Sequence, residues 1–329
     1  MGRTSPASST ALIIGHMLLA SCQQTASGAA PPAAPQRPVD GPPPTYRPSC
    51  PVDPSQWLRV ERGTAPIVVT ATHSGSERPP GCDPGTDVVH EVAERACPDE
   101  LDALCESGPC VAGGPDGFSR DLVLAFVEEL AACLGERPSL VLTEVRRSVI
   151  DPNRDAVDGS GAACAFDDPA ALAHWEAFHA AVEEQVAAAI ADSDERALVL
   201  DLHTYSSRAA APPPALVLGA GLPFGRTLPH RAAADETLAE IFGVDGLRAQ
   251  LLASMASIDA AAAVYPVAVD AASDELFNGR YLVHRYARLT GPAGPVVDAL
   301  QVEVSRGLCE HTAAASRALA EAVCATIAP

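Results

Sequence analysis

Three polar side chains with catalytic potential each follow an apolar, β-branched run of residues. His73 follows PIVVTAT, Arg147 comes just after SLVLTEV, and His203 follows RALVLDL. Such runs are typical of buried strands. In open α/β sheets, ligands bind beyond the carboxyl ends of the strands. We therefore expect these three side chains to lie close together, at one edge of a sheet.

The two histidines are candidates for metal ligands. A catalytic zinc ion takes three protein ligands and leaves one position for water. His73 and His203 would supply nitrogen, and Glu77, Asp87 or Glu91 would supply a carboxylate oxygen. The alternative is that each histidine is a partly buried, hydrogen-bonded residue that binds no metal. The sequence has no HExxH motif, so spacing alone does not decide between the two interpretations.

The segment RRSVIDPNRD offers a candidate site for a carboxylate. Arg147, Asn153 and Arg154 could clamp a substrate carboxylate, because the guanidinium group binds a carboxylate in a two-pronged manner. The alternative is a surface loop in which the two arginines pair with Asp151 and Asp155.

Glu303 is a carboxylate within the otherwise apolar run LQVEV. An unpaired, ionised carboxylate in a core is costly. Glu303 is therefore expected either on the wet face of a strand or in a site. A glutamate beside a metal-bound water is the usual general base of metal-assisted amide hydrolysis.

The elements that must position these residues alternate between strands and helices. This alternation, with nearly continuous apolar strands, predicts a single α/β domain in which helices flank a mixed, mostly parallel central sheet. The expected strands are 66–72, 139–145, 196–202, 214–219 and 297–304, and the expected helices are 120–135, 168–193, 236–242, 246–255 and 311–328.

The N-terminal segment is predicted to direct export. The apolar run from Ala11 to Ala20 is too short to span a bilayer and is typical of a signal peptide. LASC resembles a bacterial lipobox, in which Cys22 is lipidated and becomes the mature N-terminus; the alternative is an ordinary signal peptide. We expect an envelope lipoprotein that faces the periplasm or the cell surface. Its predicted parts are a signal peptide (1–21), a Pro/Ala-rich disordered tether (22–52) and a catalytic domain (53–329).

Charge and cysteine content narrow the expected partners. A net charge of −20, from 42 acidic residues against 22 Lys and Arg, disfavours binding to nucleic acid. Membrane contact is expected only through the lipid at Cys22. The nine other cysteines favour disulfides in an exported protein, although an odd number leaves at least one thiol or an intermolecular bond. No CxxC pair is present, so a zinc site made of cysteines is not expected.

Several motifs together resemble the N-formylglutamate amidohydrolase family. HSG, RRSVIDPNR, DLH, FNGRYLVHRY and LQVEV occur in that family's order, over residues 64–310. The family is related in fold to zinc carboxypeptidases, so the resemblance implies a zinc carboxypeptidase-like (phosphorylase/hydrolase-like) fold. It also implies one zinc ion per chain and hydrolysis of the amide bond of an N-acyl amino acid, a peptide or another small substrate that carries a carboxylate.

The resemblance also implies roles for individual residues. The zinc ligands would be His73, Asp87 and His203; Asp87 stands in the family's TD position, and Glu77 is the fallback. Glu303 would be the general base and later the proton donor. The substrate would be held by Arg147, which also counts as catalytic, and by Asn153, Arg154, Tyr281, Arg285 and His179.

Four departures from the family's pattern leave the substrate open. Thr204 replaces the usual Ser or Gly, Arg280 and Ala287 replace glycines, and Cys309 replaces a tyrosine. The positions of the metal ligands and the base are intact. Two alternative functions remain: a zinc carboxypeptidase or amidase acting on peptide or cell-wall fragments, and a non-catalytic, ligand-binding lipoprotein that keeps the fold. Glu303 favours the two enzyme functions over the non-catalytic one, because a binding protein needs no base beside a metal.

Overall fold

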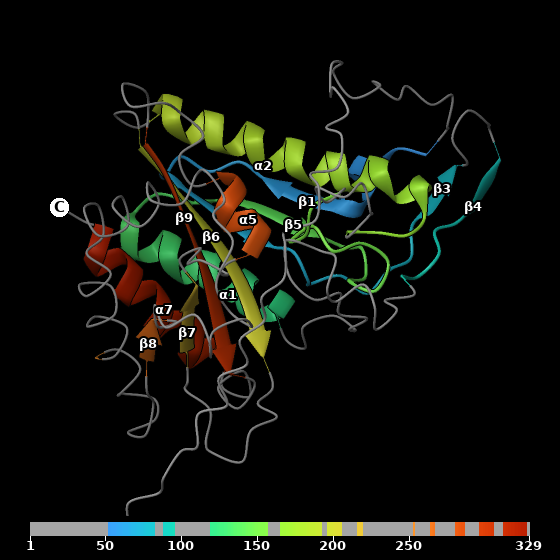
Figure 1. Ribbon diagram of the computed structural model, residues 1–329. Helices are drawn as coiled ribbons and strands as arrows, with labels where there is room; N and C mark the ends of the chain where they lie inside the picture. Colours follow the sequence, from blue (N-terminus) through green and yellow to red (C-terminus); the bar gives the residue numbers. More distant parts are fainter. Residues whose placement is uncertain are drawn as a thin grey trace, which may run out of the picture. The chain divides into compact units, whose positions relative to one another are not determined.

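Figure 1 shows the computed structural model of the protein. The described residues are 52–82, 88–95, 119–156, 165–192, 196–205, 216–219, 253, 264–266, 280–286, 296–305 and 312–327. The elements are η1 (Pro54–Trp57), β1 (Leu58–Glu61), β2 (Ile67–Ala71), β3 (Pro80–Cys82), β4 (Val89–Glu91), α1 (Ser119–Leu134), β5 (Ser139–Thr143), η3 (Pro169–Ala171), α2 (Leu172–Asp192), β6 (Arg196–Tyr205), β7 (Leu216–Gly219), β8 (Val264–Pro266), α5 (Arg280–Tyr286), β9 (Val296–Ser305) and α7 (Thr312–Ile327).

The central element is a 7-stranded mixed sheet with the order β1-β5-β2-β6-β9-β7-β8. Strands β5, β2, β6 and β9 run parallel to one another. Antiparallel strands flank this parallel centre, because β1 pairs antiparallel with β5 and β7 pairs antiparallel with β9. The expectation of a mixed, mostly parallel central sheet is therefore confirmed. A separate two-stranded sheet contains β3 and β4.

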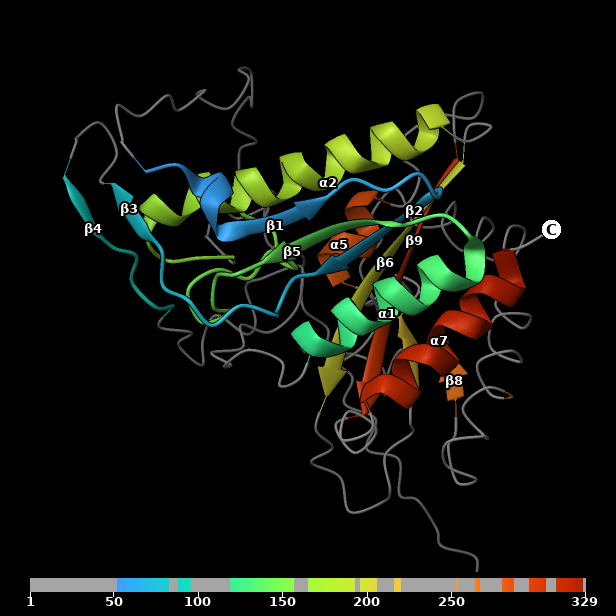
Figure 2. The ribbon, with the colours of Figure 1, turned by 180° about the vertical axis from the view of Figure 1, so that it is seen from behind.

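Helices cover both faces of the sheet, as Figures 1 and 2 show. Helices α1 and α7 pack together on one face, against side chains such as Val69 on β2, Leu200 on β6 and Val302 on β9. Helices α2 and α5 cover the other face, where Val68 and Val199 are buried. Side chains of a strand point alternately to its two faces, so both apolar layers come from the same continuous apolar runs.

The expected elements agree with the structure over most of the described residues, and two expectations need correction. The strand containing His203 does not end at residue 202, because pairing with β9 continues as far as Tyr205. His203 is therefore inside a strand. Tyr281 and Arg285 lie on helix α5, which is not among the expected helices. The expected helices 236–242 and 246–255 lie outside the described residues, apart from residue 253.

No helix among the described residues is both apolar enough and long enough to cross a bilayer. The predicted signal peptide, the lipidation site at Cys22 and the tether up to residue 51 lie outside the described residues.

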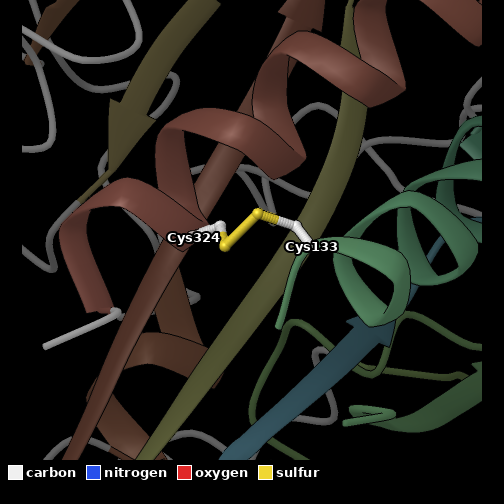
Figure 3. Close-up of a disulfide and its surroundings, with 2 residues drawn as sticks. All are labelled: Cys133 and Cys324. Atoms are coloured by element: carbon white, nitrogen blue, oxygen red, sulfur yellow. A yellow bond between two sulfur atoms is a disulfide. The ribbon is translucent and has the colours of Figure 1, made fainter. Parts of the chain in front are cut away.

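A disulfide between Cys133 and Cys324 connects α1 to α7 (Figure 3). The two Cα atoms are 6.3 Å apart, and 191 residues separate the cysteines in the sequence. The bond therefore links two helices that lie far apart in the sequence. A cross-link over so long a segment strongly restricts the unfolded chain.

We expect loss of this disulfide to lower the stability of the domain. The Cys133→Ser/Cys324→Ser variant should lose about 3–5 kcal/mol of unfolding free energy, which corresponds to a fall of roughly 10 °C in Tm. Thermal unfolding without reductant measures the effect. Ala132→Ser, a change at the exposed neighbouring position, is the control and should leave Tm unchanged. A double variant as stable as this control would contradict the prediction.

Candidate active site

One face of the sheet changes from apolar to polar as its parallel strands run toward their carboxyl ends. On the face covered by α2 and α5, Val68, Val199 and Ala299 lie in register and are buried. Two residues further along each strand, the next row on this face is polar. It consists of Thr70, Asp201 and Gln301, which are again in register and are almost fully buried.

The following row contains His203 and Glu303, which pair in register across β6 and β9. The side chain of Thr72, just past the end of β2, lies beside them, with its Oγ1 3.2 Å from Nε2 of His203. His203 and Glu303 are only 1% and 6% exposed. Gln301 donates a hydrogen bond from Nε2 to Oε1 of Glu303. Glu303 therefore belongs to a buried polar site and not to the wet face of a strand.

His73 reaches the same site from the loop after β2. It is 3% exposed, and its ring meets the ring of His203 edge-on, with 4.6 Å between the centroids. The loop is held in place by Ser74, whose hydroxyl donates to the carbonyl of Thr143 at the end of β5 (2.9 Å). Gly75 permits a close approach of two segments, because a Cβ there would lie 2.1 Å from the carbonyl carbon of Glu144. The expected convergence of the two histidines is confirmed.

Asp151 lies at the centre of a buried cluster of positive charge. Its Oδ1 is 2.8 Å from Nε2 of His73, and its Oδ2 accepts a hydrogen bond from Nε of Arg147 (3.2 Å). Nitrogens of Arg95 and Arg154 are each 3.8 Å from Oδ2. Burial raises the pKa of Asp151, but the charges of His73, Arg154 and Arg147 outweigh burial and hold that pKa well below its usual range. Asp151 is therefore ionised.

The three residues expected to clamp a substrate carboxylate surround this internal carboxylate. Arg154 is 1% exposed and donates to the carbonyl of Asn153 (2.7 Å). The side-chain oxygen of Asn153 accepts from the backbone N–H of Leu282 (2.9 Å), which connects the loop to α5. The side chain of Arg147 is 15% exposed, more than that of Arg154. Both arginines pair with Asp151, as the alternative interpretation predicts, but the cluster is buried and does not form a surface loop; a role toward substrate stays a prediction.

His179, Tyr281 and Arg285 lie together between α2 and α5. The ring of His179 packs 4.2 Å from that of Trp175, measured between centroids. The guanidinium of Arg285 lies over Trp175 at 5.3 Å and donates to the hydroxyl of Tyr281 (2.6 Å) and to Glu183 (2.7 Å). In this structure the three predicted substrate-binding residues help to pack α5 against α2. Their role toward a substrate stays a prediction.

None of the described residues supplies the expected third metal ligand beside the two histidines. Asp87 lies outside them. Glu77 is exposed, with the hydroxyl of Ser76 3.3 Å from its Oε1, and Glu91 is exposed and bound to Arg78 (3.0 Å). Within the described ranges, no three His, Cys, Asp or Glu side chains come together in a way that could hold a metal ion.

The two histidines themselves are suited to bind zinc. An ionised carboxylate only accepts hydrogen bonds, so Nε2 of His73 carries a proton that it donates to Asp151. Nε2 of His203 is likewise 2.6 Å from Oδ2 of Asp201. Histidines that bind metal usually donate their second ring N–H to a carboxylate or a carbonyl. The site thus offers two oriented nitrogen donors and would need a third ligand from elsewhere.

Sequence reasoning missed Arg95, which is buried against Asp151 and donates to the carbonyl of Arg147 (2.9 Å). No apolar run or motif precedes Arg95, so no signal in the sequence placed it near the site. The sequence suggests Asp151 only as a surface partner of the two arginines, and it gives no sign that Asp151 also contacts His73.

Comparisons with known proteins support the fold. No known protein family matches the sequence, and no curated protein is similar to it in sequence. The fold is similar to that of N-formylglutamate amidohydrolase from Ralstonia eutropha JMP134, with a TM-score of 0.50 and 17% identity over 82% of this chain and 97% of that one. A gene product of Agrobacterium tumefaciens matches with a TM-score of 0.44 and 13% identity, over 82% and 91% of the two chains. The first likeness is one of fold alone, and the second is too distant to argue from.

Buried neutral histidines predict a loss of stability in mild acid. Burial and the nearby charge of Arg285 hold the pKa of His179 well below its usual value, and burial lowers that of His174. Below a pH of about 6.5 the unfolded chain binds protons that these folded side chains do not bind, so stability is full above that pH and falls with acidity. The expected slope is about 1.4 kcal/mol per pH unit for each histidine.

Urea unfolding between pH 7.5 and 5.5 measures this slope. His179→Gln should make the slope shallower than that of the wild type. Phe178→Leu is the control, because it removes packing at the neighbouring buried position without removing a titrating group. An unchanged slope in His179→Gln would contradict the prediction.

Proposed function

We propose that this chain is a zinc-dependent hydrolase that cleaves the amide bond of an N-acylated amino acid or another small substrate with a carboxylate. One observation carries the proposal: two buried histidines, with ring centroids 4.6 Å apart, share a polar site with a buried glutamate on the neighbouring strand. The similarity of the fold to that of an N-formylglutamate amidohydrolase also supports the proposal.

His73 and His203 would hold the zinc ion, with Asp87 as the preferred third ligand and Glu77 as its alternative. A bound zinc ion would supply a water of pKa about 7 and would polarise the amide carbonyl. The carboxylates of Asp151 and Asp201 hold the two imidazole rings in fixed orientations. Because the rings are fixed by buried partners, they need no reorganisation when a ligand binds.

Glu303 would act as general base and then as proton donor to the leaving nitrogen. Its position opposite His203 in the β6–β9 ladder supports this role, because His203 would hold the metal ion. The amide of Gln301 restricts the orientation of its carboxylate. A base on a strand in the middle of the sheet is held rigidly, and rigid positioning of a general base is what proton transfer requires.

Arg147 would bind the substrate carboxylate. It contacts Asp151 through Nε and is the more exposed of the two arginines predicted for this role. Arg154 and Asn153 are almost fully buried, so their contribution would be to hold the cationic loop in place.

The metal and the base can be tested separately. Purified protein should contain about one zinc ion per chain, and His203→Ala should lose it. Glu303→Gln should keep the zinc while hydrolysis of N-acyl amino acids falls by about 10²–10⁴-fold. Metal analysis and a hydrolysis assay measure the two effects.

Other outcomes would redirect the proposal. A folded wild-type protein that binds no metal would rule out the zinc hydrolase and favour a non-catalytic, ligand-binding lipoprotein. Activity that survives in Glu303→Gln would show that Glu303 is not the base. Hydrolysis of peptides or cell-wall fragments in preference to N-acyl amino acids would favour the carboxypeptidase or amidase alternative.

We also propose that the protein is exported and anchored in the bacterial envelope by a lipid on Cys22. Cys22→Ser should move the protein from the membrane fraction to the soluble fraction and abolish incorporation of labelled fatty acid. Cys50→Ser, which changes another cysteine of the N-terminal segment, is the control and should remain in the membrane fraction. A Cys22→Ser protein that keeps its label would contradict lipidation at this residue.

A further inference from the structure

Two buried carboxylates each hold one of the two histidines, but their surroundings differ. Asp151 holds His73, and Asp201 holds His203. Both carboxylates are fully buried. The difference between their other partners allows the contribution of each carboxylate to be separated.

Asp151 shares its charge among several cations. Arg147 donates to it, and guanidinium nitrogens of Arg95 and Arg154 are 3.8 Å away. The backbone N–H of Asn153 also donates to its Oδ1 (3.0 Å). The negative charge that faces His73 is therefore largely balanced by other groups.

Asp201 has far fewer partners. Among the described residues, it meets only Thr70, whose hydroxyl donates to Oδ1 (2.9 Å), and His203, whose Nε2 is 2.6 Å from Oδ2. Thr70 and Asp201 pair in register on β2 and β6, so the backbone ladder fixes this contact. Asp201 and His203 are two residues apart on one strand and thus point to the same face.

We propose that Asp201, anchored by Thr70, is the positioning residue of His203. It fixes the Nε2–H tautomer, so that Nδ1 would be the nitrogen that holds the metal ion, and it would raise the donor strength of the ring. The proposal deepens the proposed function and rests on it. Because no guanidinium of the described part of the chain pairs with Asp201, Asp201 polarises its histidine more strongly than Asp151 polarises His73. Carboxylates in this position typically change metal affinity by 10–100-fold.

The test measures metal binding in the full chain. Metal-free wild type, Asp201→Asn and Thr70→Val are titrated with zinc against a chromophoric chelator, and visible spectra are recorded with cobalt(II). Asp298→Asn is the matched control, because Asp298 is a buried carboxylate on β9 in register with Leu198, before the polar rows begin. Thr70→Val keeps the shape of the side chain and removes only its hydroxyl, so it tests the proposal even if Asp201→Asn does not fold.

We expect Asp201→Asn to bind zinc about 10–100-fold more weakly and to shift the cobalt band. Thr70→Val should show a smaller loss of affinity, and Asp298→Asn should bind as the wild type does. Unchanged affinity and spectra in both Asp201→Asn and Thr70→Val would overturn the positioning role but leave the zinc hydrolase intact. A wild type that binds no zinc would overturn the proposed function itself.

The tautomer gives a readout that needs no metal. In metal-free wild type, ¹⁵N NMR of the histidine rings should show His203 protonated at Nε2, and Asp201→Asn should change this signal. A His203 ring protonated at Nδ1 in the wild type would overturn the proposal.

Discussion

The parallel pairing of β6 with β9 is the interaction on which the candidate site depends. The two strands pair along their whole length, from Arg196 with Val296 to Tyr205 with Ser305. This register places His203 opposite Glu303 and Asp201 opposite Gln301. A slip of β6 by one residue would turn Asp201 and His203 to the opposite face, into the apolar layer beneath α1 and α7, and a slip of β9 would do the same to Gln301 and Glu303. The hydrophobic residues that alternate with them therefore fix the geometry of the polar site.

The same alternation explains how a buried polar site can coexist with two apolar layers. Leu200 and Leu202 face α1 and α7, while Asp201 and His203 face the opposite side. Burying ionisable groups is costly unless each is paired and hydrogen-bonded. Here the carboxylates are satisfied by neighbours that the sheet already brings into register or that the loops after β2 and β5 supply. Removing one partner of such a pair typically costs about 3–5 kcal/mol, so the site and the fold stabilise each other.

The strands and helices with regular apolar spacing could be predicted from the sequence. Features that depend on contacts between distant segments, such as the end of β6, could not. Apolar runs located β2, β5, β6 and β9, and helical spacing located α1, α2 and α7. The sequence predicts an end of β6 at residue 202, because His203 and Thr204 are polar and polar residues commonly follow a buried strand. Both residues remain in the ladder because β9 continues beside them. The apolar pattern of a strand indicates that the strand is buried, but it does not indicate how far the neighbouring strand extends beside it.

The loop RRSVIDPNRD shows why site residues were only partly predictable. Its arginines suggested a carboxylate partner, which could be a substrate or the loop's own Asp151 and Asp155. The structure shows that Asp151 is a partner of these arginines. Arg95, from a distant segment, and His73, just after β2, contact the same carboxylate. A cluster with several cations around one carboxylate is expensive to assemble unless that carboxylate stays ionised. Asp151 therefore links the cationic loop to His73, and any anion that approaches Arg147 meets a site whose positive charge is already partly balanced. Such partial balance holds the arginine side chains in place when no substrate is bound. It would also weaken their attraction for the carboxylate of the proposed substrate. Selectivity of the proposed hydrolase would then depend on more than the charge of its substrate.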